Sequence, residues 1–190
     1  MRIFITIYIN SPVRIRRDQR SAQGDHFDWH PATGPGVEER EGHIFMNNLV
    51  VANKPDIGPL LQVEQPAALC KKLAQPMLST LDGNVYVRPD TSYAALATPL
   101  VKWVDTHSTD CSSSFASLPA FQKQVSGFEV HGQQLDGDAR SVFTAPDIDR
   151  FQLLQALPAS RDVAMPKAVR KLLDWSKKEA ALTVGAYPAD

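Results

Sequence analysis

The sequence predicts an α+β fold: a small mixed domain with a β-hairpin, several amphipathic helices and a C-terminal helix. Two observations supply the elements. Short apolar runs are typical of strands, and longer stretches with helical spacing of apolar residues are typical of amphipathic helices. A third observation sets the class, because strands and helices do not alternate regularly along the chain as they do in a parallel α/β sheet.

The strand and helix candidates in the first half lie on either side of turn-forming residues. Two short strands, LVVA at 49–52 and LLQV at 60–63, are separated by NKPDIGP. An amphipathic helix is expected over 65–81 and another over 93–104, each interrupted by a proline, Pro76 and Pro99. Between them, VYVR at 85–88 is a strand candidate.

The second half predicts a hairpin between helices. LPAFQKQV at 118–125 is expected to form a short helix that begins from Ser117. GFEVHG at 127–132 and ARSVFTA at 139–145 lie on either side of Asp136-Gly137, a dipeptide typical of hairpin turns. A further helix is expected from Pro146, and the last over 166–184, which begins at Pro166 and ends at Gly185.

Composition divides the chain near residue 45. The stretch from Ser11 to Gly42 has little aliphatic content and many prolines and glycines, so residues 1–45 are interpreted as a flexible N-terminal extension. A second interpretation makes these residues a translated leader ahead of a true start at Met46. In both interpretations, residues 46–190 form a single globular domain.

Charge and cysteine usage limit the classes of function. The net charge is −1, which gives no overall electrostatic case for nucleic acid or an anionic membrane. No apolar stretch approaches the roughly 20 residues that span a bilayer. Cys70 and Cys111 lie 41 residues apart without a CxxC motif, so a soluble, cytoplasmic protein is expected.

Three histidines in GDHFDWHPATGPGVEEREGH, residues 24–43, suggest a metal site. His26 and His30 have the i, i+4 spacing that suits zinc on a helix, and His43 could complete the ligand set with nearby carboxylates. Pro31 and the glycines and prolines after it disfavour a helix here. The alternative is a solvated, histidine-rich leader, and no cofactor is then expected.

A cysteine follows an aspartate in STDCSSSF, residues 108–115. The Asp-Cys-Ser sequence resembles the nucleophile motif of NlpC/P60-type cysteine peptidases. The resemblance implies a cysteine hydrolase in which Cys111 is the nucleophile and His131 is the base. Ser113 stands where that family usually has glycine, and the alternative is a serine-rich surface loop with an incidental thiol.

The helix expected over 166–184 carries a basic surface. Arg170, Lys171, Lys177 and Lys178 lie opposite its apolar side, with Asp174 and Glu179 among them. Such a surface fits a protein or nucleic-acid partner, although it is also typical of a solvated helix. The resulting prediction is a non-enzymatic binding or accessory protein, of the bacterial mobile-element or immunity-protein kind, that acts by surface recognition through these four cations.

Overall fold

Most strands of the protein run parallel and stack into a solenoid. The computed structural model describes residues 2–4, 6–16, 42–70, 76–90, 98–155, 157, 167 and 171. Three successive coils of three strands each make up its body. The coils are β1 (Arg2–Phe4), β2 (Ile7–Ile9) and β3 (Val13–Arg16); β4 (His43–Met46), β5 (Leu49–Val51) and β6 (Leu61–Glu64); and β7 (Leu78–Asp82), β8 (Val85–Arg88) and β9 (Val101–Val104).

Equivalent strands of the three coils pair in parallel and form three sheets. Sheet A has the order β1-β4-β7, with Ile3 opposite Phe45 and Phe45 opposite Leu81. Sheet B contains β2, β5 and β8, and sheet C contains β3, β6 and β9. Each coil therefore repeats the path of the coil before it, which is the organisation of a β-solenoid.

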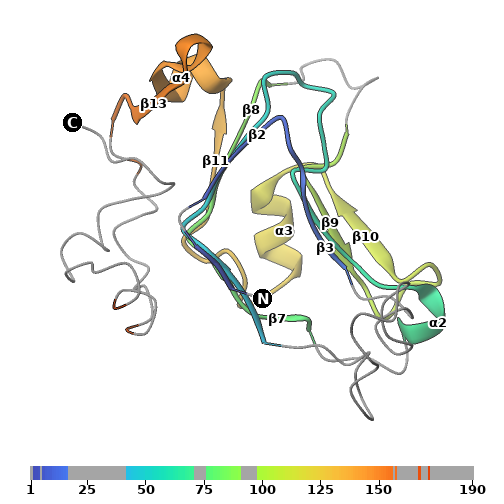
Figure 1. The fold of residues 1–190 in the computed structure, drawn as a ribbon. Helices are drawn as coiled ribbons and strands as arrows, with labels where there is room; N and C mark the ends of the chain where they lie inside the picture. Colours follow the sequence, from blue (N-terminus) through green and yellow to red (C-terminus); the bar gives the residue numbers. More distant parts are fainter. Residues whose placement is uncertain are drawn as a thin grey trace, which may run out of the picture.

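The end of the solenoid beyond the third coil is closed by elements that leave this path. β10 (Ser112–Phe115) pairs antiparallel with β9, and β11 (Gln133–Asp136) pairs parallel with β8. Between them, α3 (Leu118–Gln124) lies between sheets B and C (Figure 1). Its Phe121 is fully buried and makes an edge contact with Trp103 at a centroid distance of 5.2 Å. The helix therefore fills the interior at this end.

Sheet B is buried on both faces. Val50, Ala52 and Tyr86 belong to the core inside the solenoid, whereas Val51 and Val87 belong to a second core outside it. This outer core is covered by α4 (Ala139–Val142), β12 (Phe143–Ala145) and β13 (Arg150–Leu153), which lie beside sheet B (Figure 1). Burial on both faces explains why LVVA and VYV are continuous apolar runs without alternation.

The predicted α+β fold class is wrong, because parallel sheets dominate the described residues. In the region of the helix expected over 65–81, the described helix is α2 (Ala67–Cys70), and Leu78–Asp82 is strand β7. The C-terminal part of the helix expected over 93–104 is strand β9. Both errors have one cause: a strand buried on its core face next to a proline-containing loop has apolar spacing that mimics a helix.

The predicted hairpin is also wrong. The segment 127–132 forms turns, and 139–142 is helix α4, which begins from a capping box at Asp138. In place of a helix from Pro146 there are a 3-10 turn, η2 (Pro146–Ile148), and strand β13. The strands predicted near 49–52, 60–63 and 85–88 are confirmed, as is the helix that begins from Ser117.

The first 16 residues include strands of the solenoid. β1, β2 and β3 pair with β4, β5 and β6 in continuous register, and Val13 and Ile15 are buried. The boundary expected at Met46 therefore cuts strand β4 before its last residue and separates β1, β2 and β3 from the strands with which they pair. This part of the predicted flexible extension belongs to the globular fold, while residues 17–41 lie outside the described residues.

A chain shortened to begin at Met46 is expected to lose cooperative folding. The truncation removes β1, β2 and β3, one strand from each sheet, together with three of the four residues of β4, and it leaves β5 and β6 unpaired along one edge. Thermal melting followed by circular dichroism compares this chain with the full one. A sharp transition at an unchanged temperature in the short chain would contradict the structural role of strands β1 to β4.

Candidate functional site

A ladder of polar residues runs through the corner between sheets A and B. Thr6, Asn48 and Asn84 each lie directly before a strand of sheet B. The backbone amide of Thr6 donates to Asn48 Oδ1 at 3.0 Å, and the backbone amide of Asn48 donates to Asn84 Oδ1 at 2.9 Å. Asn48 and Asn84 are fully buried. The ladder therefore satisfies backbone donors where the chain turns and cannot form sheet hydrogen bonds.

Glu129 occupies the end of this ladder. Its carboxyl group accepts from the side-chain NH2 of Asn84 at 2.6 Å, from the backbone amide of Asn84 at 3.2 Å and from the Tyr86 hydroxyl at 2.8 Å. The residue is fully buried. Burial raises the pKa of Glu129 to about 8, and it outweighs the hydrogen bonds from Asn84 and Tyr86, which act in the opposite direction. The same surroundings raise the pKa of Tyr86 well above its ordinary value, first through burial.

Gly132 is required by the position of this carboxyl group. A Cβ atom at residue 132 would come within 2.2 Å of Glu129 Oε2. Any side chain there would displace the carboxylate from Asn84. A strongly shifted pKa is one sign of a functional site, but Glu129 has no access to solvent, so a structural role fits it better.

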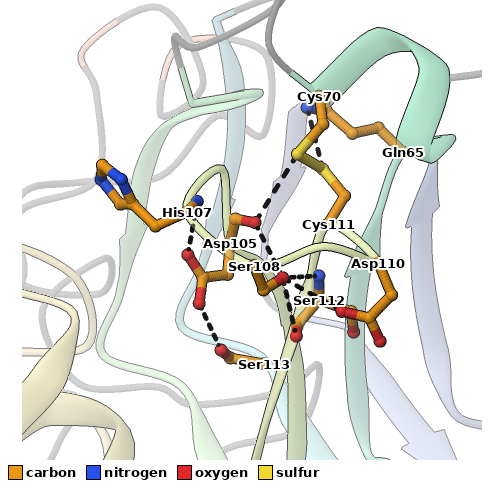
Figure 2. The surroundings of a disulfide bond; sticks show 9 residues. All are labelled: Gln65, Cys70, Asp105, His107, Ser108, Asp110, Cys111, Ser112 and Ser113. Atoms are coloured by element: carbon orange, nitrogen blue, oxygen red, sulfur yellow. Dashed lines mark hydrogen bonds between the residues drawn. A yellow bond between two sulfur atoms is a disulfide. The ribbon is translucent and has the colours of Figure 1, made fainter.

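A disulfide joins Cys70 at the end of α2 to Cys111 before β10 (Figure 2). The two Cα atoms are 5.7 Å apart, within the usual range for a disulfide, and both residues are buried. The side-chain amide of Gln65 approaches Cys111 Sγ at 3.6 Å. Because this sulfur is bonded, Cys111 carries no thiolate and cannot act as the nucleophile suggested by the peptidase resemblance.

His131, the base implied by that resemblance, belongs to a different part of the fold. It lies in the turns before β11 rather than on a strand, and its Nδ1 is 2.8 Å from Asp82 Oδ2. The Asp82 side chain also accepts from the His131 amide at 2.8 Å. His131 thus joins this turn to the end of β7.

The loop after β9 brings an aspartate, a histidine and a serine together. Asp105 accepts from the Ser113 hydroxyl at 2.6 Å and from the backbone amide of His107 at 2.9 Å. The Ser113 hydrogen bond is the main reason why the pKa of Asp105 is lowered. The His107 ring points away from Ser113 (Figure 2). The Ser113 hydroxyl therefore donates to the Asp105 carboxylate, whose lowered pKa makes it a weaker base, and not to an imidazole. The arrangement is not a catalytic triad.

Of the three proposed metal ligands, the structure describes only His43. His43 lies on β4, where its amide donates to the Met77 carbonyl, and His26 and His30 lie outside the described part. No group of three or more histidine, cysteine, aspartate or glutamate residues suited to a metal ion occurs among the residues described. The zinc site of His26, His30 and His43 stays a prediction.

The basic helix is described at two positions. Lys167 and Lys171 are helical and exposed, whereas Arg170, Lys177 and Lys178 lie outside the described residues. Their expected role in binding stays a prediction.

The outer face of sheet C carries a group of cations that the sequence analysis missed. Val13, Ile15, Leu61 and Val63 point into the core, so alternation turns Arg14, Arg16, Gln62 and Glu64 outward. Arg14 donates to Glu64 through Nε at 2.7 Å, and Arg16 Nε lies 3.6 Å from the same oxygen. Lys102, opposite Gln62 in the register, has no ion-pair partner in the part of the chain that the structure describes.

We define the cationic face as Arg14, Arg16, Gln62, Glu64 and Lys102. It contains three cations and one carboxylate on three adjacent parallel strands. The two arginine side chains are 55% and 45% exposed, so they are open to a partner. Alternation in VRIR was the available signal, but the assignment of residues 1–45 to a flexible extension concealed it.

Replacement of Glu129 with glutamine is expected to remove a pH dependence of stability. The unfolded chain loses this proton near the ordinary pKa of 4.5, whereas the folded protein keeps it to about 8. The free energy of unfolding should therefore fall as pH rises through this interval, by up to about 1.4 kcal/mol per unit, and level off above it. Urea denaturation across the interval measures the slope.

The surface variant Glu64→Gln is the matched control and should keep the slope. Equal slopes in wild type and Glu129→Gln would contradict the assignment of the proton to Glu129.

Loss of the disulfide is expected to destabilise the protein markedly. A bond across 41 residues lowers the entropy of the unfolded chain and so adds about 4 kcal/mol to the free energy of unfolding. The double variant Cys70→Ser/Cys111→Ser should lose this contribution. Denaturation of that variant and of reduced wild type should agree. Iodoacetamide should label neither cysteine before reduction and both after it; labelling of Cys111 alone without a reductant would show a free thiol.

Comparison with protein-family models, with curated proteins and with solved structures finds no match to this chain. Its function is therefore inferred from its own residues. Of the features above, the ladder and the disulfide stabilise the fold, and the cationic face is the one that is open to a partner.

Proposed function

We propose that the protein is a non-catalytic binding protein whose cationic face recognises an acidic protein partner. The observation that supports this proposal is the excess of two positive charges on this face, held on paired strands. Because the backbone of a sheet is rigid, these side chains are held at fixed spacings without an entropic cost for ordering a loop. This proposal keeps the surface recognition that the sequence predicts, but it assigns the binding surface to sheet C and not to the helix over 166–184.

The number of cations favours a protein over nucleic acid. Stable binding to DNA commonly uses six or more phosphate contacts, about twice the number that three cations could make. The whole chain has a net charge of −1 and supplies no general attraction to a polyanion. A partner surface with two or three carboxylates would complement Arg14, Arg16 and Lys102.

We further infer that the protein acts in an oxidising compartment. The disulfide supports this inference, because disulfides persist in oxidising compartments, whereas the cytoplasm keeps cysteine thiols reduced. The cytoplasmic location expected from the sequence would require both thiols to be free. None of the helices in the described residues has the length and apolar character needed to cross a membrane.

Neutralisation of the cationic face is expected to weaken binding to an acidic peptide. The triple variant Arg14→Gln/Arg16→Gln/Lys102→Gln should bind a fluorescent glutamate-rich peptide at least about tenfold less tightly than wild type at low salt. Wild-type binding should itself weaken between about 50 and 200 mM NaCl. Fluorescence anisotropy measures both effects.

A second triple variant separates the position of the charges from their number. Lys123, Arg140 and Arg150 are exposed cations elsewhere on the protein, and their replacement with glutamine changes the net charge equally. This control should bind like wild type. Equal weakening in both variants, or no binding of the peptide by wild type, would refute recognition by the cationic face.

A further inference from the structure

A buried arginine without a counter-charge lies inside the third coil. Arg88 is the last residue of β8, two positions after Tyr86, so its side chain points to the same interior face of sheet B. Its exposed fraction is 6%. No ion pair joins it to a carboxylate anywhere in the described residues. Buried cations in proteins are normally paired, so this exception calls for an explanation.

The hydrogen bonds of Arg88 leave most of its donors unused. Nη1 donates to the carbonyl oxygens of Pro99 at 3.3 Å and Ile57 at 3.5 Å, and both bonds are long. Among the described residues, Nε and Nη2 have no acceptor. Burial also lowers the pKa of Arg88, as expected for a cation deprived of water without a compensating anion.

Gly58 preserves the position of the guanidinium group. A Cβ atom at residue 58 would lie 2.9 Å from Arg88 Nη1 and 2.8 Å from the Pro99 carbonyl oxygen. The absence of a side chain there lets the loop before β6 approach the arginine closely. Backbone groups thus contact Arg88 at Nη1, and its other donors have no acceptor in the part of the chain that the structure describes.

A hollow of ≈ 420 Å³ has Arg88 in its lining. It is lined by Arg88, Asp90, Ser117, Gln134 and Asp136, together with three apolar residues. Gln134 Oε1 accepts from the Leu118 backbone amide at 2.8 Å, and the Gln134 NH2 group donates to none of the residues that the structure describes. Asp90 and Asp136 are exposed, and Asp136 accepts from the Asp90 amide at 2.6 Å. The hollow therefore combines a buried cation with two exposed carboxylates.

We propose that this hollow binds the carboxylate group of a small ligand, with the Arg88 guanidinium as its counter-ion. The planar guanidinium matches a carboxylate through two parallel hydrogen bonds, and Nε and Nη2 form the pair of donors that this geometry uses. Gln134 and Ser117 would donate to or accept from polar groups beside the carboxylate. The site is independent of the cationic face on sheet C.

The charges around the hollow select a monoanion over a dianion. Asp90 and Asp136 add negative potential near the hollow, which opposes phosphate, with its higher charge, more strongly than a carboxylate. Acetate should therefore bind more tightly than inorganic phosphate at equal ionic strength.

Nuclear magnetic resonance titration of the full chain with acetate tests the proposal. The Arg88 Nε–H signal and the amide signals of Asp90 and Leu118 should shift and saturate, with chloride at matched ionic strength as the reference. Tighter binding of phosphate than acetate, or shifts spread over surface cations without saturation at Arg88, would overturn it.

Three conservative variants sharpen this test, the last of them as a control. Arg88→Lys keeps the charge but loses the paired donors, and should weaken acetate binding about tenfold or more. Asp90→Asn alters an exposed residue, so the fold should be kept, and loss of a nearby negative charge should tighten binding a few-fold. Asp149→Asn, at an exposed position in the connection between β12 and β13, should leave it unchanged. Identical affinities in all three would refute the role of Arg88.

Discussion

The solenoid depends on the hydrogen bonds that satisfy its buried corners. Parallel strands pair along their lengths, but each coil must turn from sheet A to sheet B inside the molecule, where water is absent and backbone groups need partners. Asn48 and Asn84 supply those partners from one coil to the next, and Glu129 supplies them where the coils end. A carboxyl group is costly to bury, and it is retained here because it accepts three donors at once. Successive coils are thus joined by side-chain hydrogen bonds at the corner between sheets A and B.

Sequence analysis identified the strands that are buried on both faces, but not how they pair. LVV and VYV were recognised because continuous apolar runs are a local property. Their partners, IYI and the residues from 133, lie roughly 40 to 50 positions away, and no local pattern reports such pairing. The polar residue directly before each of IYI, LVV and VYV was visible in the sequence, but its meaning depends on the coils being stacked. Strands β7 and β9 were mistaken for helix because prolines and short apolar spacings fit both periods.

The candidate sites show the same division between local and long-range information. The pairing of Cys70 with Cys111 could not be deduced from spacing, and it changes the chemistry of both residues. Arg88 belongs to a strand that was predicted correctly, yet its burial depends on loops 31 residues before it and 11 after it. The cationic face required β3, β6 and β9 to be adjacent. In each case the residue types were evident and their neighbours were not.

The position of α3 limits how copies of this protein could assemble end to end. A solenoid with two open ends can add identical copies head to tail, and such contacts extend without closing. Here the interior beyond the third coil is occupied by Phe121 and its neighbours, so an incoming coil would find no apolar surface on which to continue the stack. The short helix therefore ends the stack at this side, because its apolar residues fill the space inside the sheets that a further coil would need.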